Sequence, residues 1–192
     1  MRFLPASGHK RMPWKNGKGM TTEIAVHPSG ASVADFEWRI STASVAEDGA
    51  FSLFEGVDRT LAVLSGEGID LLVGQASPVR LHKNSLPFRF PADEATSAVL
   101  LDGAITDLNV MTRRGRWEHD VARFALEGAL SLSIGAEVVL IIGHEGLVRV
   151  CTKDEEQPLG PLDAVVTSGG SFVLQSDGQG CSFFIVTLGF VS

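Results

Sequence analysis

Short apolar runs separated by turn residues recur along the whole chain of 192 residues, and this pattern constrains the fold more than any other feature. Runs of this length, bounded by glycine-containing turns, are typical of antiparallel strands. The chain contains 21 glycines, and no long stretch shows convincing helical periodicity. The sequence therefore predicts an all-β protein in which helix is scarce.

The expected strands fall into two groups. In the first half they cover residues 22–27, 36–45, 59–65, 69–73, 79–82, 86–90, 95–101 and 105–112. In the second half they cover residues 121–126, 130–134, 137–142, 147–151, 163–166, 171–175 and 182–188. Residues 61–69 can be aligned with residues 139–147, because both are apolar strands that enter a turn ending in Glu-Gly. This similarity favours a duplicated architecture, although such strand-turn patterns are common enough to arise by coincidence.

The strand expected over residues 36–45 has two unlike faces. Alternation places Phe36, Trp38 and Ile40 on one face and Glu37, Arg39 and Ser41 on the other. A solvent-exposed face would account for the polar side. The segment of residues 105–113 is harder to explain in that way, because its odd-numbered residues Ile105, Asp107, Asn109, Met111 and Arg113 form a mixed face. Mixed faces are typical of pocket linings.

A loop ahead of the first long strand combines a cation, an amide and glycines. Lys15 and Asn16 are followed by Gly17 and Gly19, and Glu23 opens the strand. Glycine permits close backbone approaches that a side chain would prevent, and the polar groups offer a charge, an amide and an acceptor. The loop is therefore predicted to hold a ligand, and the alternative is an ordinary solvated loop.

Several separate motifs together resemble the HutD/Ves family over about residues 4–125. The motifs are Pro13-Trp14-Lys15-Asn16-Gly17, Thr22-Glu23-Ile24-Ala25, Trp38-Arg39-Ile40-Ser41, Asp48-Gly49, Phe51-Ser52, Gly56, Asp58-Arg59, Leu64-Ser65-Gly66-Glu67-Gly68 and Asp107-Leu108-Asn109-Val110-Met111-Thr112-Arg113-Arg114-Gly115. The family typically has three glycines after the asparagine. Here Lys18 stands in the middle, which puts the shape and the charge of this loop in question.

The resemblance implies a bicupin of the RmlC-like type, with two antiparallel β-barrels or jelly rolls packed together in one compact unit over residues 1–192. It also implies a link to bacterial histidine utilisation, and it implies no established reaction. The first barrel is expected over about residues 1–115 and the second over residues 116–192. Because the polar strands lie in the first half, the site is expected in the first barrel. Phe172, Phe183 and Phe184 are expected in the core of the second.

The residues themselves favour recognition of a small anion. Arginine offers a planar fork that matches a carboxylate, and a nearby lysine adds charge. Amide and hydroxyl groups could orient the ligand, and the carboxylates could restrain the arginines or accept from a ligand N–H. The predicted ligand-binding residues are Lys15, Asn16, Glu23, Arg39, Ser41, Asp107, Asn109 and Arg113. Trp14, Trp38 and Phe51 are either walls of this site or simple core.

Charge and composition exclude several classes of function. The formal charge of -7 disfavours binding to nucleic acid and to anionic membranes, because both require a basic surface. The five histidines show no metal-ligand spacing and are expected at the surface or in turns, so neither a metal nor a cofactor is predicted. Cys151 and Cys181 are expected to be reduced, and the chain, without a signal or a membrane span, to be cytoplasmic.

The leading hypothesis is a binding protein that senses or buffers an anionic amino-acid derivative, such as the histidine-degradation intermediate formylglutamate. The alternative is a metal-independent enzyme that acts on a similar metabolite, with Glu23 or Asp107 as the general base. A homodimer is possible. A third hypothesis is a macromolecular partner docked on the basic turn Arg113-Arg114-Gly115-Arg116, although such runs are usually solvated or locally paired.

Overall fold

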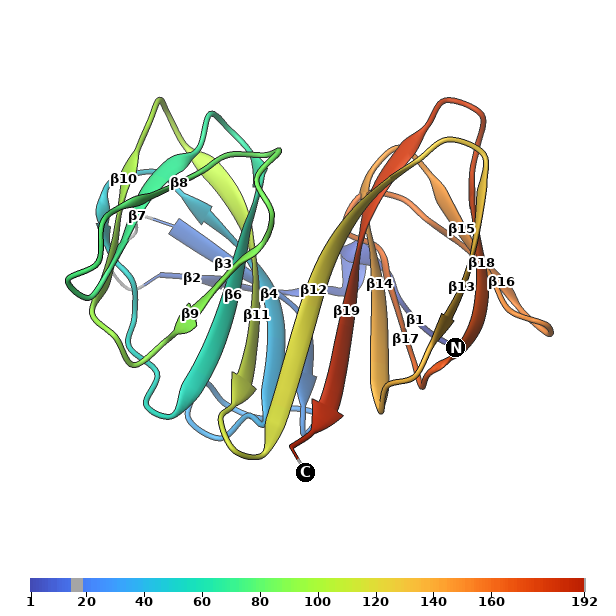
Figure 1. Ribbon diagram of the computed structural model, residues 1–192, viewed down its shortest axis with the longest axis horizontal. Helices are drawn as coiled ribbons and strands as arrows, with labels where there is room; N and C mark the ends of the chain where they lie inside the picture. The colour runs from blue at the N-terminus through green and yellow to red at the C-terminus, as the bar shows by residue number, and fades with distance from the viewer. Residues whose placement is uncertain (15–18, 192) are drawn as a thin grey trace. The chain divides into compact units, whose positions relative to one another are not determined.

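The computed structural model describes residues 1–14 and 19–191, and the described chain is built almost entirely from antiparallel strands (Figure 1). The exception among its regular elements is one short 3-10 helix, η1 (Ala6–Gly8). The all-β prediction is therefore confirmed. The chain divides into two compact units. We call Lys10–Glu118 the amino-terminal unit, and Met1–His9 together with His119–Ser192 the carboxy-terminal unit.

Two antiparallel sheets make up the amino-terminal unit. The six-stranded sheet has the order β2-β3-β4-β11-β6-β9, and its strands are β2 (Lys10–Pro13), β3 (Gly19–His27), β4 (Trp38–Val45), β6 (Val57–Ser65), β9 (Phe88–Pro91) and β11 (Ile105–Arg113). The four-stranded sheet has the order β5-β10-β7-β8, and its strands are β5 (Gly49–Ala50), β7 (Ile69–Val73), β8 (Val79–Leu81) and β10 (Thr96–Leu100). The two sheets lie face to face within this unit (Figure 1).

The carboxy-terminal unit also consists of two sheets. The five-stranded sheet has the order β1-β17-β14-β19-β12, and its strands are β1 (Arg2–Leu4), β12 (Trp117–Leu126), β14 (Val138–Glu145), β17 (Ala164–Thr167) and β19 (Cys181–Phe190). The four-stranded sheet has the order β13-β18-β15-β16, and its strands are β13 (Ala129–Ile134), β15 (Val148–Cys151), β16 (Glu156–Leu159) and β18 (Gly170–Ser176). The sequence placed residues 1–9 with the first barrel, whereas β1 pairs with β17.

Both units repeat one strand order. In the larger sheets, β4-β11-β6-β9 corresponds to β12-β19-β14-β17, and in the smaller sheets β5-β10-β7-β8 corresponds to β13-β18-β15-β16. The correspondence preserves the order along the chain, with β2 and β3 added in the amino-terminal unit and β1 added in the other. The aligned segments 61–69 and 139–147 fall on β6 and β14 with the turns that follow them. The duplication suggested by the sequence is thus present in the topology.

Apolar side chains fill the interior of the carboxy-terminal unit. Phe172 and Phe183 belong to one buried cluster, and Phe124 stacks on Phe183 with their ring centroids 5.4 Å apart. Phe184 is buried as well, so all three of the expected core phenylalanines are buried. Cys181 belongs to the same cluster, and both cysteines are free thiols.

Edge strands account for most of the elements that the sequence did not predict. β1, β2, β5 and β16 were not expected, and each lies at the edge of its sheet. Three prolines lie within strands, namely Pro13 in β2, Pro91 in β9 and Pro158 in β16, and all three strands are edges. Proline lacks the N–H that an inner strand must donate, so an edge is where a sheet tolerates it. Among the described residues, no helix is long and apolar enough to cross a membrane.

The turn between β6 and β7 provides a test of the fold. Gly68 has a φ of +119°, and a Cβ atom added there would lie 2.3 Å from the carbonyl oxygen of Leu81. We expect Gly68→Ala to lower the free energy of unfolding by about 3 kcal/mol, because left-handed strain and overlap add together. Gly103→Ala is the matched control, since Gly103 also has a positive φ, of +64°, but has open space around it. The control should lose only about 1 kcal/mol in urea denaturation, and equal losses would contradict the steric argument.

Candidate functional site

The inner face of the six-stranded sheet carries a group of polar side chains, which we call the polar band. Its members are Glu23 on β3, Arg39 and Ser41 on β4, Arg59 on β6, and Asp107 and Asn109 on β11. All of them except Glu23 are buried, and the Glu23 side chain is only 15% exposed. The polar face that the sequence showed on residues 36–45 is therefore not a solvent-exposed face.

Strand register brings these residues together. Asn109 lies opposite Ser41 on β4, and Ser41 lies opposite Glu23 on β3. Two residues further along β11, Met111 lies opposite Arg39 on one side and Arg59 on the other. Because side chains alternate between the faces of a sheet, the odd-numbered residues of β4, β6 and β11 all project to the same side. Residues far apart in the sequence thus share one interior.

Apolar clusters bound the polar band at both ends. On β11, Asp107 and Asn109 stand between Ile105, which belongs to one buried cluster, and Met111, which belongs to another. On β6, Arg59 stands between Val57 and Leu61, which belong to the same two clusters. The first cluster also contains Ile69, Leu71 and Ala98 of the facing sheet. The polar band therefore lies inside the unit and not on its outside.

A chain of hydrogen bonds connects Arg59 to Asp107. Nε of Arg59 donates to Oδ1 of Asn109 over 2.8 Å, and Nη2 of Arg59 donates to the same oxygen. Nδ2 of Asn109 then donates to Oδ1 of Asp107 over 2.7 Å, and the backbone N–H of Ala43 donates to that oxygen over 3.2 Å. The guanidinium also stacks on an aromatic ring, with its Cζ 4.5 Å from the centroid of Phe51. Arg59 and Asn109 are therefore held in fixed orientations.

Residues that the structure describes hold Arg39 at one nitrogen only. Its Nε donates to Oε2 of Glu23 over 2.8 Å, and this ion pair is largely buried. Within the part of the chain that the structure describes, Nη1 and Nη2 of Arg39 have no hydrogen-bond partner. The fork of this guanidinium, which is the part that fits a carboxylate, is thus left for another group.

Burial changes the pKa of the two ionisable residues at the centre of the polar band. Desolvation raises the pKa of Asp107 to about 6, although the charge of Arg59 and the hydrogen bonds from Asn109 and Ala43 oppose this rise. Desolvation lowers the pKa of Arg59 to about 10, which leaves it protonated at neutral pH. Oδ2 of Asp107 is buried and has no hydrogen-bond partner in the described part of the chain. Asp107 is therefore a carboxyl group that can change its protonation state near neutral pH.

Arg113 is positioned differently from the other predicted residues. Its guanidinium donates to the backbone carbonyl oxygens of Phe36 over 3.0 Å and Glu55 over 2.9 Å, and also to that of Ala34. It packs over the ring of Phe36, with Cζ 5.2 Å from the centroid. All three of its nitrogens are thus bonded to the backbone, and these contacts fix two loops rather than present a free fork.

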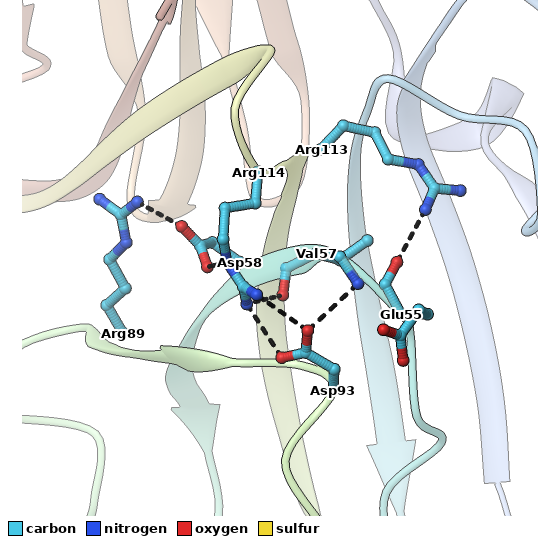
Figure 2. A network of polar contacts seen from close by, with 8 residues as sticks. Glu55, Val57, Asp58, Arg89, Asp93, Arg113 and Arg114 are labelled. Carbon is cyan, nitrogen blue, oxygen red and sulfur yellow. Dashed lines mark hydrogen bonds and ion pairs between the residues drawn. The ribbon is translucent and has the colours of Figure 1, made fainter.

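The other arginines of the basic turn are paired with carboxylates. Figure 2 shows Arg114 between Asp58 and Asp93, with Arg89 on the far side of Asp58 and Arg113 directed toward Glu55. Nε of Arg114 lies 2.8 Å from Asp58, and its two terminal nitrogens lie 2.8 and 2.9 Å from the oxygens of Asp93. Arg116 pairs with Glu37 over 2.7 Å. This neutralised turn offers no support for docking an acidic partner.

The structure brings together most but not all of the predicted site. Glu23, Arg39, Ser41, Asp107 and Asn109 share the polar band, and Arg113 lies apart from it. Lys15 and Asn16 lie outside the described residues, and so does Lys18. The sequence prediction of the site did not include Arg59. The one indication in the sequence was a single cation among the apolar residues of a strand. Phe51 lies against Arg59, whereas Trp38 projects from the opposite face and stacks on His27.

The donor set of the polar band does not suit a metal ion, although many cupin-type proteins hold one. The band contains no histidine, and two arginines would repel a cation. Each of its two carboxylates accepts a hydrogen bond from a neighbouring group through one oxygen, Glu23 from Arg39 and Asp107 from Asn109. Over the described ranges, no group of three or more metal-ligating residues occurs.

Two histidines are placed differently from the sequence prediction. His119 and His144 were expected at the surface or in turns, but both are buried in strands of the carboxy-terminal unit. Nδ1 of His144 lies 2.9 Å from the hydroxyl of Ser182 and 3.2 Å from Nη2 of Arg123. Strand alternation buries a polar residue wherever both faces of a strand are covered, and the sequence does not show which strands have two covered faces.

Comparison with known proteins identifies the family. The family model described as HutD matches residues 6–184. The chain belongs to the HutD family. It is 36% identical to an uncharacterized 21.2 kDa protein encoded in the hutC 3′ region of Pseudomonas putida, over 94% of this chain and 93% of that protein. It is also 42% identical to protein Ves of Citrobacter koseri, over 58% of this chain and 59% of that protein.

Solved structures agree with this membership. A conserved protein of unknown function from Pseudomonas aeruginosa PAO1 superposes with a TM-score of 0.91 at 32% identity, covering 98% of each chain. HutD from Pseudomonas fluorescens SBW25, determined in a formate condition, superposes with a TM-score of 0.83 at 27% identity, covering 100% of this chain and 99% of that one. A cupin 2 conserved barrel domain protein from Leptotrichia buccalis shares the fold alone, with a TM-score of 0.54 at 10% identity.

The buried carboxyl of Asp107 makes stability depend on pH. Its pKa is about 6 in the folded chain against an ordinary value of 3.8, so stability falls as the pH rises through this interval. The ionised form costs up to about 3 kcal/mol at neutral pH. The stability of the Asp107→Asn variant relative to the parent chain should therefore increase by about this amount as the pH rises from 4 to 7, measured by urea denaturation.

Asp93→Asn is the matched control. Arg114 lowers the pKa of Asp93 to about 2, so this carboxylate stays ionised in the folded chain from pH 4 to pH 7. The stability difference between the control and the parent should therefore stay nearly constant over this interval. A pH-independent difference for Asp107→Asn as well would contradict the assignment of a raised pKa to Asp107.

Proposed function

We propose that this protein binds a small anionic amino-acid derivative in the polar band of its amino-terminal unit and thereby modulates histidine utilisation. A formylglutamate-like intermediate of histidine degradation is the proposed ligand. The anionic character of the ligand is supported by the terminal nitrogens of Arg39, which have no partner among the described residues and fit a carboxylate. The pathway follows from the names of the relatives, which include a HutD protein and a protein of the hutC region.

The observation that carries the proposal is the unsatisfied fork of Arg39. The Arg39 side chain is only 6% exposed, and its terminal nitrogens have no hydrogen-bond partner among the described residues, so they can donate to a ligand. A ligand carboxylate would satisfy both nitrogens at once. Arg59 lies on the same inner face and adds positive charge, and Asn109 and Ser41 add an amide and a hydroxyl.

Structural requirements of the fold do not explain the polar band. The carboxy-terminal unit repeats the strand order, and its interior is filled by apolar side chains such as Ile141, Phe183 and Ile185. Replacing buried ion pairs by apolar residues of similar size is often neutral or stabilising. Retention of two arginines in only one of two similar interiors therefore supports a binding role for them.

A second candidate is a metal-independent enzyme acting on a similar metabolite. Asp107 favours this candidate, because a buried carboxyl with a pKa of about 6 and one unpartnered oxygen has the properties of a general base. Glu23 fits the role less well, since Arg39 holds it. Release of formate from formylglutamate by chelator-treated protein, lost in Asp107→Asn, would favour the enzyme.

The Arg39→Ala variant tests the binding function. Histidine, urocanate, formiminoglutamate, formylglutamate, glutamate and formate should be compared in a thermal-shift assay. A ligand present at about a hundred times its dissociation constant stabilises the parent by about 2.7 kcal/mol. We expect Arg39→Ala to lose about 2 to 5 kcal/mol of binding free energy, because the carboxylate then lacks its fork. Arg39→Lys should lose most of this affinity as well, since lysine keeps the charge without the fork.

Arg80→Ala provides a matched control in the same unit. Arg80 is exposed and pairs with Asp70 in two parallel hydrogen bonds of 2.8 Å, between the neighbouring strands β7 and β8. Its removal should leave ligand affinity unchanged. If Arg39→Ala binds the ligand as tightly as the parent does, Arg39 is structural and the proposed site is wrong.

A further inference from the structure

The buried oxygen Oδ2 of Asp107 has no hydrogen-bond partner among the described residues, and it is the one such carboxylate oxygen within the polar band. Its other oxygen accepts from Asn109 and from the backbone of Ala43, whereas Oδ2 accepts from nothing that the structure describes. Asp107 is fully buried, with an exposed fraction of 0%. An unsatisfied charged oxygen in such a place is expensive, so some occupant or some proton should satisfy it.

The described charges of the polar band already balance. Arg39 and Arg59 supply two positive charges, and Glu23 and ionised Asp107 supply two negative charges. An anionic ligand would therefore add a negative charge without compensation in a poorly solvated interior. Protonation of Asp107 removes one negative charge, which compensates for one of the two carboxylates of a formylglutamate-like ligand.

Hydrogen-bond chemistry leads to the same conclusion. Ionised Oδ2 can only accept hydrogen bonds, and a ligand carboxylate can also only accept them, so the two groups repel each other. A protonated carboxyl has one donor, which a ligand oxygen can accept. One proton thus converts Asp107 from a group that opposes the anion into one that binds it.

We propose that the anionic ligand binds together with one proton, which Asp107 takes up and donates as a hydrogen bond to the ligand. The proposal rests on the proposed function and adds a regulation to it, since acidification would tighten binding and alkalinisation would weaken it. The proton comes from solvent and stays on Asp107 while the ligand is bound. No covalent bond forms or breaks.

The groups that face Asp107 are consistent with this coupling. The charge of Arg59 on β6 acts on Asp107, which in register lies opposite Ala43 on β4 and Val63 on β6. Ser41 and Arg39 lie two and four residues from Ala43 along β4, and Glu23 lies opposite Ser41 on β3. The facing sheet contributes Ile69, Leu71 and Ala98 to this interior, and no ionisable residue of that sheet is buried among the described residues. Burial raises the pKa of Asp107 to about 6, so its proton uptake can be measured between pH 5 and pH 7.

Isothermal titration calorimetry with N-formyl-L-glutamate tests the proposal. Titrations in buffers of different ionisation enthalpy give the number of protons taken up per ligand. We expect close to one proton at pH 7 and close to none at pH 5, where Asp107 is already protonated. The affinity should fall about tenfold per pH unit above pH 6.5. The carboxylates of the probe stay ionised throughout this range, so they do not contribute to the change.

Two variants separate Asp107 from other titrating groups. Asp107→Asn places a permanent N–H donor where Oδ2 stands, so its binding should be independent of pH and free of proton uptake. Asp70→Asn makes the same chemical change at a partly exposed carboxylate that pairs with Arg80, and it should bind as the parent does. Proton uptake that persists in Asp107→Asn would overturn the proposal.

A ligand-free measurement on the parent chain keeps the proposal testable if the variant misfolds. Carbon-13 NMR of labelled aspartate carboxyls should show one buried carboxyl that titrates near pH 6. Titration of every carboxyl in the ordinary range, or a carboxyl still protonated at pH 8, would overturn the proposal. Binding without proton uptake would overturn it and leave the proposed function intact. If none of the six compounds binds at pH 5.5 or pH 7.5, the proposed function itself fails.

Discussion

The hydrogen-bond chain from Arg59 through Asn109 to Asp107 is the constraint on which the amino-terminal interior depends. Each member is buried. Arg59 donates to the oxygen of Asn109, and the nitrogen of Asn109 donates to Asp107. Removing the middle member would leave a buried cation and a buried carboxyl without their shared amide, so the three residues act as a unit. The β-sheet supplies the geometry, because Asn109 and Asp107 are two residues apart on β11 and Arg59 projects beside them from β6. A rigid sheet therefore holds a charged group in a fixed orientation, as recognition of a small molecule requires.

The carboxy-terminal unit shows what the same topology does without such a requirement. Its sheets follow the same order, yet β14 and β19 fill the interior with Ile141, Phe183 and Ile185. Apolar packing of this kind needs no partner of particular geometry and costs no desolvation of charge. The contrast separates architecture from interior chemistry. Strand order and turns define the architecture, and the interior side chains define what each unit can bind.

Periodicity was enough to predict the strands that carry the site, because an alternating pattern records which residues share a face. It placed Arg39 with Ser41 and Asp107 with Asn109, and the register of β4 against β11 then joined the two pairs. Periodicity could not indicate which polar faces are covered, since coverage depends on a second sheet that is distant along the chain. Arg59 illustrates this limit, because one cation in an apolar strand reads equally well as an exposed residue. Edge strands such as β2 and β16 were missed for a related reason, since a proline in the sequence argues against an inner strand and is silent about an edge.

Arginine content alone did not single out the arginine proposed to bind the ligand, and the partners of each arginine explain why. Arg113 donates to backbone carbonyls, and Arg114 forms ion pairs with two aspartates (Figure 2). The nitrogens of both guanidinium groups are therefore already bonded to the protein itself. Among the described residues, Arg39 is bonded through Nε alone, and its two terminal nitrogens have no hydrogen-bond partner. Only an arginine in this last condition can exchange water for a ligand without first breaking a bond to the protein. The decisive property is therefore unsatisfied donor capacity in a buried position, which a sequence motif containing arginine does not reveal and a hydrogen-bond inventory does.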